Sequence, residues 1–409
     1  MMQNSFTPVV RFAVTSDIHF EDDYRSERER LATAMQVANR FAEECAAYPK
    51  LDAFFIAGDA ASSGTMVQYE ALLEIIKAHK KPETELVYSL AGHEYRDVGI
   101  EGAWDRLRTL FGMEPDRHLV INGFHFISLS AGESPTAKSN GYNAEKSAWY
   151  EAQIRAAIAD DPQRPIFSFQ HPHPENTCYG SAEWGTTDLL EIQRKYPQLI
   201  TFSGHSHAPI NDPRSIWQGD FTSIGTGSFA YFELDELDKV YGTVPPDSQI
   251  CAQFHIVEAD AEKRVRVLSY DIITGRFFDQ CWLIEKAWDK SSFVYTNDRP
   301  GSECAPYFAE TDAISVDSVT SDSVTISFPQ AQIDAFRVNA YYLVLCDEHG
   351  QEVRTESVWS HYYLNDMPTR MTWTLKELAP KTTYTATIYA TNFWAKRSPN
   401  MLQCTFTTK

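Results

Sequence analysis

The chain lacks four features that would place it in other classes of protein. It has no CxxC pair among its seven cysteines, no excess of basic residues, no apolar run of membrane-spanning length and no basic, apolar leader in the N-terminal MMQNSFTPVVRFAV. Seven is an odd number, and such cysteines predict mostly reduced thiols in a reducing compartment. We therefore expect a cytoplasmic protein with no membrane partner, unless a leader has been removed.

The charge balance limits the partners further. The chain has 36 Lys and Arg against 56 Asp and Glu, which gives a formal net charge of -20. A surface that is acidic on average releases few counterions from a phosphate backbone, so a nucleic-acid polymer is not expected as a partner. A length of 409 residues allows two or more domains.

Six apolar runs end in residues that can bind metal or carry polar chemistry. The runs do not alternate with polar residues, so they predict strands that are covered on both faces. They are RFAVTSDIH with Asp17 and His19, AFFIAGD with Asp59, LVYSLAGHE with His93 and Glu94, HFISLSAG with Ser128 and Ser130, PIFSFQHPH with His171 and His173, and LITFSGHSH with His205 and His207. Ligands of open α/β sheets bind beyond the carboxyl ends of the strands, so we expect a metal-dependent enzyme.

Helical periodicity separates these runs. The expected helices cover residues 31–41, 72–76, 149–158 and a segment that begins after Thr187 as N-cap. The alternation of strand and helix from residue 9 to 203 predicts a largely parallel sheet. Strand-like runs over 222–285 predict a second sheet of the same domain, and residues 291–310 have the composition of a linker.

The last hundred or so residues read as a separate all-β unit. Short alternating strands and polar turns predict an immunoglobulin-like sandwich over 311–409. Its segment LAPKTTYTATIYA resembles the tyrosine-corner region of a fibronectin type III domain, which implies that Tyr384 bonds back to the upstream backbone. No catalytic constellation lies inside this unit, so we expect it to pack on the first domain or to mediate a protein contact.

Five pieces of sequence, taken in order, resemble the motifs of the calcineurin-like metallophosphoesterase family. They are Asp17-Ile18-His19, Gly58-Asp59, Ala91-Gly92-His93-Glu94, His171 and Gly204-His205-Ser206-His207. Each is weak alone, but together they span about residues 9–285, each at the end of an expected strand. The resemblance implies an α/β fold for residues 1–300, in which two sheets form a sandwich flanked by helices in four αββα layers.

The resemblance also implies a dinuclear metal centre with a bridging hydroxide. The first metal would be held by Asp17, His19, Asp59 and His207, and the second by Asp59, His171 and His205. Carboxylate mixed with imidazole suits Mn, Fe or Zn. One position departs from the family, because Gly92 stands where the family has an Asn ligand. The second metal is therefore expected to be weakly held or completed by water.

The family match gives His93 a different role. It would protonate the leaving oxygen or stabilise the transition state, and Glu94 would orient its ring. Ser203 and Ser206 are expected to hydrogen-bond to the ligands. Loop residues beside the motifs are candidates for substrate contact. Packing is the alternative for the aromatic residues Tyr179 and Trp184, and a place in a proline-rich loop is the alternative for His173. These residues are Tyr95, His173, Asn176, Tyr179 and Trp184.

The expected reaction is metal-dependent hydrolysis of a phosphoester. Two metals about 3.5–4 Å apart can lower the pKa of a bridging water and clamp the phosphoryl oxygens. A small phosphodiester, such as a cyclic nucleotide, is favoured over a phosphomonoester, because an acidic His93 suits departure of an alkoxide. Two alternatives remain: a binding or scaffold protein whose site is weakened at Gly92, and, ranked below it, a protein phosphatase.

Overall fold

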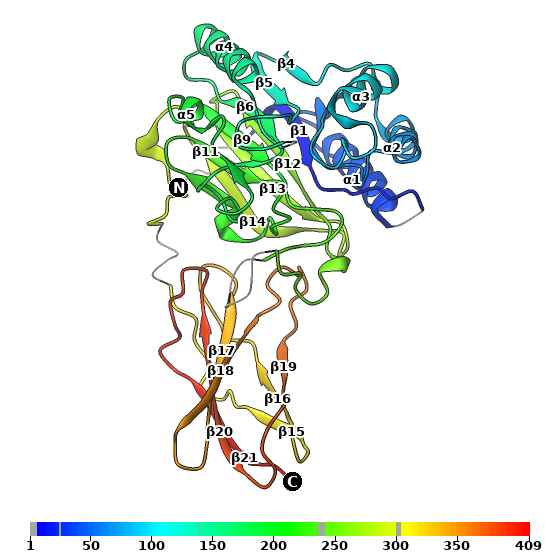
Figure 1. The fold of residues 1–409 in the computed structure, drawn as a ribbon. Coiled ribbons are helices and arrows are strands. Elements are labelled where there is room, and N and C mark those ends of the chain that lie inside the picture. The colour runs from blue at the N-terminus through cyan, green and yellow to red at the C-terminus, as the bar shows by residue number, and fades with distance from the viewer. Residues whose placement is uncertain (1–5, 24–25, 139, 235–236, 238–241, 300–303) are drawn as a thin grey trace. The chain divides into compact units, whose positions relative to one another are not determined.

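The computed structural model describes residues 6–23, 26–138, 140–234, 237, 242–299 and 304–409 (Figure 1). It divides the chain into two compact units: unit 1 comprises Met1–Leu234 and Tyr241–Asn297, and unit 2 comprises Asp235–Val240 and Asp298–Lys409. The expected domain bounds, 1–300 and 311–409, stay predictions, and residues 300–303 of the expected linker lie outside the described part. Among the residues described, no helix combines the length and the apolar character needed to cross a bilayer.

Unit 1 is built on two six-stranded sheets. The first has the order β14-β13-β12-β1-β2-β3, and the second has the order β10-β11-β9-β6-β5-β4. The strands of the first sheet are β1 (Pro8–Thr15), β2 (Ala53–Ala57), β3 (Glu85–Ser89), β12 (Gln253–Asp260), β13 (Val265–Asp271) and β14 (Arg276–Ile284). Those of the second are β4 (Asp116–Ile121), β5 (Phe124–Leu129), β6 (Ile166–Gln170), β9 (Leu199–Ser203), β10 (Ile216–Gln218) and β11 (Thr222–Gly225).

The six apolar runs are strands, as predicted, but they do not form one parallel sheet. β1, β2 and β3 pair in parallel in the first sheet, and β5, β6 and β9 do so in the second. The expectation that 222–285 forms a second sheet of its own is also wrong. β11 joins β9 in parallel, whereas β12 pairs antiparallel with β1. All eight residues of β12 are buried, which suits a strand inside a sheet.

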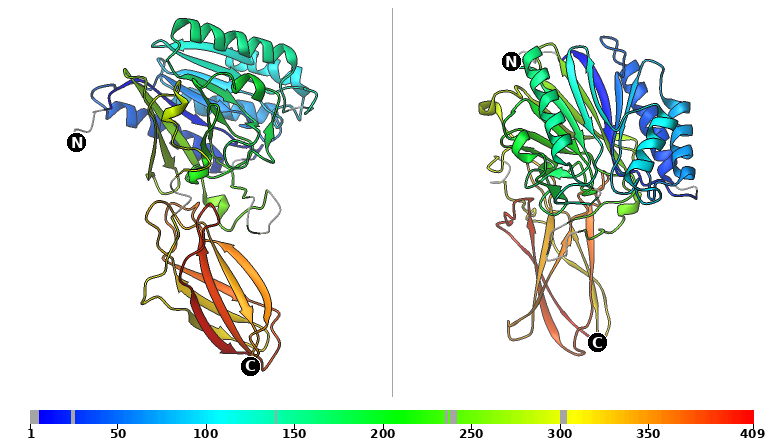
Figure 2. Two further views of the ribbon diagram at one scale, coloured as in Figure 1. Left: turned by 90° about the vertical axis from the view of Figure 1, so that its left-hand side faces the viewer. Right: turned by 45° about the horizontal axis from the view of Figure 1, so that its top comes forward.

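Helices cover the outer faces of both sheets, as two further views show (Figure 2). α1 (Ser26–Glu43), α2 (Met66–His79) and α3 (Gly99–Arg106) pack on the first sheet. α4 (Ala144–Asp160) and α5 (Leu190–Gln193) pack on the second. Thr187 is not the N-cap that the sequence suggested. α5 is a single turn with Leu189 as its N-cap, and Thr187 contributes only its carbonyl to a turn with Leu190.

Alternate residues of one strand serve two cores. In β2, Phe54 and Ile56 pack against the helices, whereas Phe55 points toward the other sheet. Phe55 stacks there on Phe169 of β6, with ring centroids 3.8 Å apart. Burial on both faces removes the usual alternation of apolar and polar residues, which explains the continuous apolar runs. The four αββα layers expected for this unit are confirmed.

Unit 2 is an all-β sandwich. A sheet of order β15-β16-β19 faces a sheet of order β18-β17-β20-β21. The strands are β15 (Ser315–Val319), β16 (Val324–Pro329), β17 (Ala340–Cys346), β18 (Glu352–Trp359), β19 (Arg370–Leu375), β20 (Thr383–Thr391) and β21 (Leu402–Thr407). The sequence had not suggested β18. The hydroxyl of Tyr384 accepts a hydrogen bond of 3.0 Å from the backbone N–H of Ala379, which confirms the tyrosine corner.

Candidate metal centre

Four strands of unit 1 bring six candidate ligands together. The ligands follow β1, β2, β6 and β9 directly, at the carboxyl ends of these strands. They are Asp17, His19, Asp59, His171, His205 and His207. Because β1 is parallel to β2 and β6 is parallel to β9, one edge of the two-sheet sandwich collects all of them.

Most of these ligands have an unusual backbone. The φ angles are positive at Asp17 (50°), His19 (55°), Asp59 (52°), His205 (74°) and His207 (51°). Side chains other than glycine rarely adopt this left-handed conformation, and such strain collects at functional sites. The conformation turns the chain sharply after each strand, so that the side chain stays at the sheet edge.

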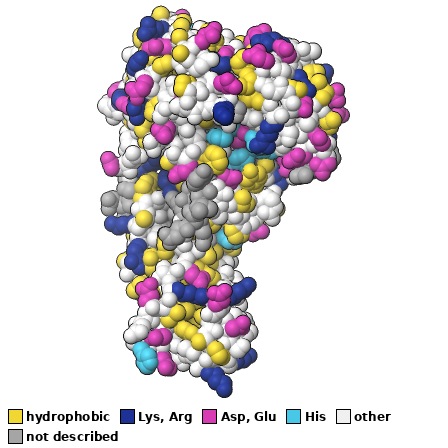
Figure 3. Space-filling view, viewed as in Figure 1, with side chains coloured by type: hydrophobic (Ala, Val, Ile, Leu, Met, Phe, Trp, Pro, Cys, Tyr) yellow, Lys and Arg dark blue, Asp and Glu magenta, His cyan; other side chains and the backbone are white. Residues whose placement is uncertain are grey.

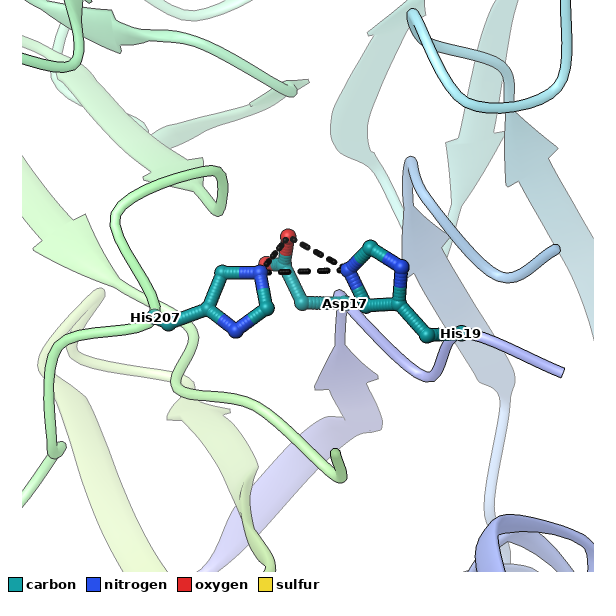
Figure 4. A group of neighbouring side chains, drawn as sticks. All are labelled: Asp17, His19 and His207. Atoms are coloured by element: carbon teal, nitrogen blue, oxygen red, sulfur yellow. Dashed lines mark hydrogen bonds and ion pairs between the residues drawn. The ribbon is translucent and has the colours of Figure 1, made fainter. Parts of the chain in front are cut away.

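Asp17, His19 and His207 form the first cluster (Figure 4). Asp17 Oδ1 lies 3.3 Å from His207 Nε2 and 3.9 Å from His19 Nε2. The two Nε2 atoms are 3.1 Å apart. At most one of two neutral imidazole nitrogens that face each other can carry the shared proton. A carboxylate oxygen and two facing nitrogens make a donor set that fits a cation.

Asp59, His171 and His205 form the second cluster. The Nδ1 of His171 lies 2.9 Å from the carbonyl oxygen of Ala57, and because a carbonyl only accepts, this nitrogen donates. Its Nε2 forms an ion pair with Asp59 Oδ2 at 2.9 Å, in a geometry that does not meet that of a hydrogen bond. Asp17 Oδ1 is likewise buried without a hydrogen-bond partner. Buried polar atoms left in this way fit a metal ion, which would satisfy them.

The electrostatics agree with a cation site. Burial opposes the charge of Asp59, but His171 beside it holds the pKa of this carboxyl well below its usual range. Burial likewise opposes the charge of Asp17, and His207 and His171 hold its pKa low. Burial lowers the pKa of His205 to about 4. Against burial, Asp59 and Asp17 raise the pKa of His171 to about 10, and Asp17 raises the pKa of His207. These two imidazoles balance the charge of the carboxylates, and a bound cation would take over that role as it displaces their protons.

Two glycines make room for these ligands. A Cβ on Gly58 would lie 2.5 Å from His171 Nδ1. A Cβ on Gly204 would collide with Asp17 Oδ2 and with the hydroxyl of Ser16. Both glycines precede a ligand, so the strand ends approach one another at these points because no side chain stands between them.

His93 lies beside both clusters. Its ring centroid is 4.5 Å from that of His19, and its Nε2 is 4.0 Å from Asp59 Oδ2. Its Nδ1 donates to the carbonyl of Ser62 at 2.8 Å, and its Nε2 lies 2.8 Å from the guanidinium of Arg96. Burial, with a contribution from Arg96, lowers the pKa of His93, although Asp59 opposes the shift. Arg96 was not predicted from the sequence, where its only signal is its position in the turn that follows His93.

Glu94 does not orient the ring of His93, contrary to expectation; Ser62 does. The buried Glu94 carboxylate accepts four hydrogen bonds, from the backbone N–H groups of Asp59, Ala61 and Ala91 and from the hydroxyl of Tyr88. Burial and the nearby Asp59 raise the pKa of Glu94 to about 7. Glu94 therefore ties the turn after β2 to the turn after β3, and it acts on the site through the backbone.

A cavity of 290 Å³ opens beside His205. Its lining includes Asn140, Glu175, Glu183, Trp184 and His205. The indole of Trp184 packs edge-on against the ring of His205, with centroids 4.8 Å apart. Figure 3 shows histidine side chains gathered on one face of unit 1. Of the five loop residues expected to contact substrate, Trp184 alone is among the described residues that line this cavity.

The other four loop residues lie elsewhere. Tyr95 is buried and its hydroxyl donates to the carbonyl of Ala131. Tyr179 packs under the guanidinium of Arg214, 4.2 Å from the ring centroid. Asn176 is exposed. His173 does not line this cavity; it is fully buried in the proline-rich segment, where it begins the two-residue strand β7 (His173–Pro174).

Ser203 and Ser206 hydrogen-bond to His173 and not, as expected, to the candidate metal ligands. The hydroxyl of Ser203 is 2.6 Å from His173 Nδ1, and that of Ser206 is 2.7 Å from His173 Nε2. The ring of His173 therefore joins the end of β9 to the turn that carries His205 and His207. Periodicity gave no signal for this buried contact.

Comparisons with known proteins agree with the motifs. Residues 10–209 match the family model of calcineurin-like phosphoesterases, which confirms the resemblance. No curated protein matches the chain. A solved purple acid phosphatase from yellow lupin (Lupinus luteus) seeds is 13% identical, with a TM-score of 0.47, and the match covers 68% of this chain and 53% of that one. The chain thus spans about half the length of that enzyme.

Two further solved structures are similar to part of the chain. The fn3 domain of the human collagen alpha-1(XX) chain is 16% identical, with a TM-score of 0.20, over 25% of this chain and 83% of that one. The chicken CNTN1 FN1-FN3 domains are 18% identical, with a TM-score of 0.22, over 40% of this chain and 42% of that one.

Proposed function

We propose that unit 1 is a metal-dependent phosphoester hydrolase with a dinuclear centre, and that small phosphodiesters are its preferred substrates. The observation that carries the proposal is the adjacency of two carboxylate–imidazole clusters, which keep buried ligand atoms without hydrogen-bond partners. The family match over residues 10–209 supports the reaction class.

The assignment of ligands follows the two clusters. Asp17, His19, Asp59 and His207 would hold the first metal, and Asp59, His171 and His205 would hold the second, with Mn, Fe and Zn the ions that suit this donor set. Such a pair supplies a water of lowered pKa and positive charge for the phosphoryl oxygens. Asp59 is the shared residue, and Glu94 fixes its position through the Asp59 backbone N–H.

His93 and Arg96 would contact the phosphoryl group from the side of His19. His93 Nδ1 is committed to Ser62, which leaves Nε2 as the atom that exchanges a proton. An anionic phosphoryl oxygen near Nε2 would favour the imidazolium, against the burial that lowers the pKa of His93. His93 would then donate to the leaving oxygen, and the guanidinium of Arg96 would donate to the phosphoryl group.

The preference for diesters and the setting of the enzyme complete the proposal. The 290 Å³ cavity beside His205 has room for a substituent on phosphorus, with Trp184 as one wall.

Seven free cysteines favour a cytoplasmic setting. A net charge of -20 disfavours a nucleic-acid polymer as substrate. The C-terminal sandwich would pack on unit 1 or bind a protein partner.

The test compares bis(p-nitrophenyl) phosphate with p-nitrophenyl phosphate as substrates of the full chain after Mn reconstitution, with metal content measured in parallel. We expect two ions per chain and faster cleavage of the diester. Asp59→Asn should lose both metal and activity, whereas the control Asp317→Asn, on the exposed strand β15, should lose neither. Faster cleavage of the monoester would reverse the substrate choice. Less than one ion per chain without hydrolysis would favour a scaffold protein.

A further inference from the structure

Gly92, in the turn after β3, offers no side chain to the second cluster. The space beside Gly92 is nevertheless filled. A Cβ added to Gly92 would lie 2.9 Å from Nδ2 of Asn140 and 3.2 Å from both its Cγ and its Oδ1. The carboxamide of Asn140 therefore stands where a side chain at position 92 would begin.

Asn140 is held in this place by its own loop. Its Oδ1 accepts a hydrogen bond of 2.8 Å from the backbone N–H of Gly92. Gly132 and Gly141 close the loop with a pair of backbone hydrogen bonds of 2.8 and 2.9 Å. The carboxylate of Asp188 fixes it from outside, because it accepts from the hydroxyl of Thr136 and the backbone N–H of Tyr142. Gly92 thus fixes the amide directly, and Asp188 fixes the loop that carries it.

Asn140 is also connected to the second cluster through a shared cavity and through the turn after β3. Asn140 lines the same cavity as His205, which is one of the three residues of that cluster. The next residue after Gly92 is His93, whose backbone N–H donates to Oδ1 of Asp59 at 3.1 Å. Asn140 is therefore next to a turn that directly contacts Asp59. A carboxamide oxygen has two lone pairs, and the bond from Gly92 occupies one of them.

We propose that Asn140 supplies a carboxamide oxygen to the second metal position, in place of the side chain that position 92 lacks. The inference rests on the dinuclear centre of the proposed function. It assigns a ligand to a loop that none of the motifs covers. It also predicts that a side chain at position 92 must displace the carboxamide of Asn140, because the Nδ2 of Asn140 would lie 2.9 Å from the added Cβ.

Measurements of Mn²⁺ binding to the full chain test this proposal without any substrate. Calorimetry measures the binding, and electron paramagnetic resonance detects the signal of a coupled ion pair. Asn140→Leu keeps the size of the side chain and removes its oxygen. We expect the first ion to bind as in the wild type, and the second to bind about 10–100-fold more weakly with loss of the coupled signal. Asn140→Asp keeps an oxygen and should retain both ions.

The reciprocal exchange Gly92→Asn with Asn140→Gly should retain two ions and the coupled signal, because the amide returns to the same space from the other segment. Gly92→Asn alone should move the Asn140 carboxamide away from residue 92. Thr136→Val is the matched control: it loosens the same loop at Asp188, away from the amide, and should bind both ions.

The outcomes separate this inference from the proposed function. Two ions bound with wild-type affinity by Asn140→Leu would overturn the role of Asn140 and leave the dinuclear centre intact. Fewer than two ions bound by the wild type would overturn both. An equal loss in Thr136→Val would assign Asn140 to the support of the loop and overturn its role as ligand. If Asn140→Leu does not fold, the exchange variant decides, and its failure to bind a second ion overturns the inference.

Discussion

The close approach between Gly58 and His171 gives a sharp test of how the centre is built. Gly58 has a φ angle of +88°, and a Cβ at this position would lie 2.5, 2.6 and 2.8 Å from Nδ1, Cγ and Cβ of His171. Real atoms do not approach this closely, so in Gly58→Ala the imidazole must move. It would then lose its bond to Ala57 and its position beside Asp59.

The expected cost has two parts. Alanine in a left-handed conformation costs roughly 1–2 kcal/mol, and overpacking a dense site costs typically about 1–3 kcal/mol, so Gly58→Ala should lose about 2–5 kcal/mol of stability. Gly112→Ala isolates the first part, because Gly112 has a φ angle of +65° and no atom within 4 Å of its added Cβ. We expect Gly112→Ala to lose only about 1–2 kcal/mol.

Urea unfolding with a chelator present measures both losses, and the rise in melting temperature with added Mn²⁺ measures the site. Gly112→Ala should keep the whole Mn-dependent rise, whereas Gly58→Ala should lose most of it, because His171 no longer faces Asp59. Equal losses of stability in the two variants, with an unchanged Mn-dependent rise in Gly58→Ala, would refute the reasoning.

Three further predictions concern other parts of the chain. Burial lowers the pKa of His255 from 6.5 to about 4, so the unfolded state binds more protons between these values. The free energy of unfolding should therefore fall by about 3 kcal/mol because of His255 as the pH drops from about 6.5 to 4. Urea unfolding of His255→Asn over the same pH range should lack this contribution. Glu258 pairs with Arg11, both fully buried and 2.7 Å apart, so Glu258→Gln should cost about 3–5 kcal/mol in the same assay. Tyr384→Phe removes the acceptor of the tyrosine corner and should cost about 1–3 kcal/mol of stability. Tyr389→Phe changes a half-exposed ring and should cost less. Calorimetry of the unfolding of unit 2 would measure both losses.

The local sequence pattern predicted which segments of unit 1 are strands better than it predicted which strands pair. The runs that form β1, β2, β5, β6 and β9 are rich in residues that suit burial on both faces, so each was recognisable as a strand. Their division between two sheets was not recognisable, because periodicity carries no information on which strands pair. β12 illustrates this: it comes from the far end of unit 1, yet it is the antiparallel neighbour of β1.

The same limit applies to the site. Strand ends with aspartate and histidine pointed to the two clusters, since parallel strands carry their carboxyl ends to one edge. Arg96 and Asn140 were missed because their contacts depend on how a turn and a loop close, and neither follows an apolar run. Glu94 was predicted as a site residue, but its predicted contact with the ring of His93 was wrong. Its oxygens accept instead from backbone N–H groups that no sequence pattern reveals.

Contacts between the turns hold the left-handed residues of the centre in place. Such residues are strained, so neighbouring contacts must hold them. The turn after β1 has these contacts, because the backbone N–H groups of Asp17 and His19 donate to the carbonyls of Gly58 and Asp59, at 3.1 Å in each case. On the other side, the N–H of His205 donates to Oδ2 of Asp17 at 3.0 Å. The three turns are therefore bound to one another directly, and the strain of each is offset by the next. Turns that are fixed to one another in this way limit the binding energy that would be consumed in ordering them around a cation.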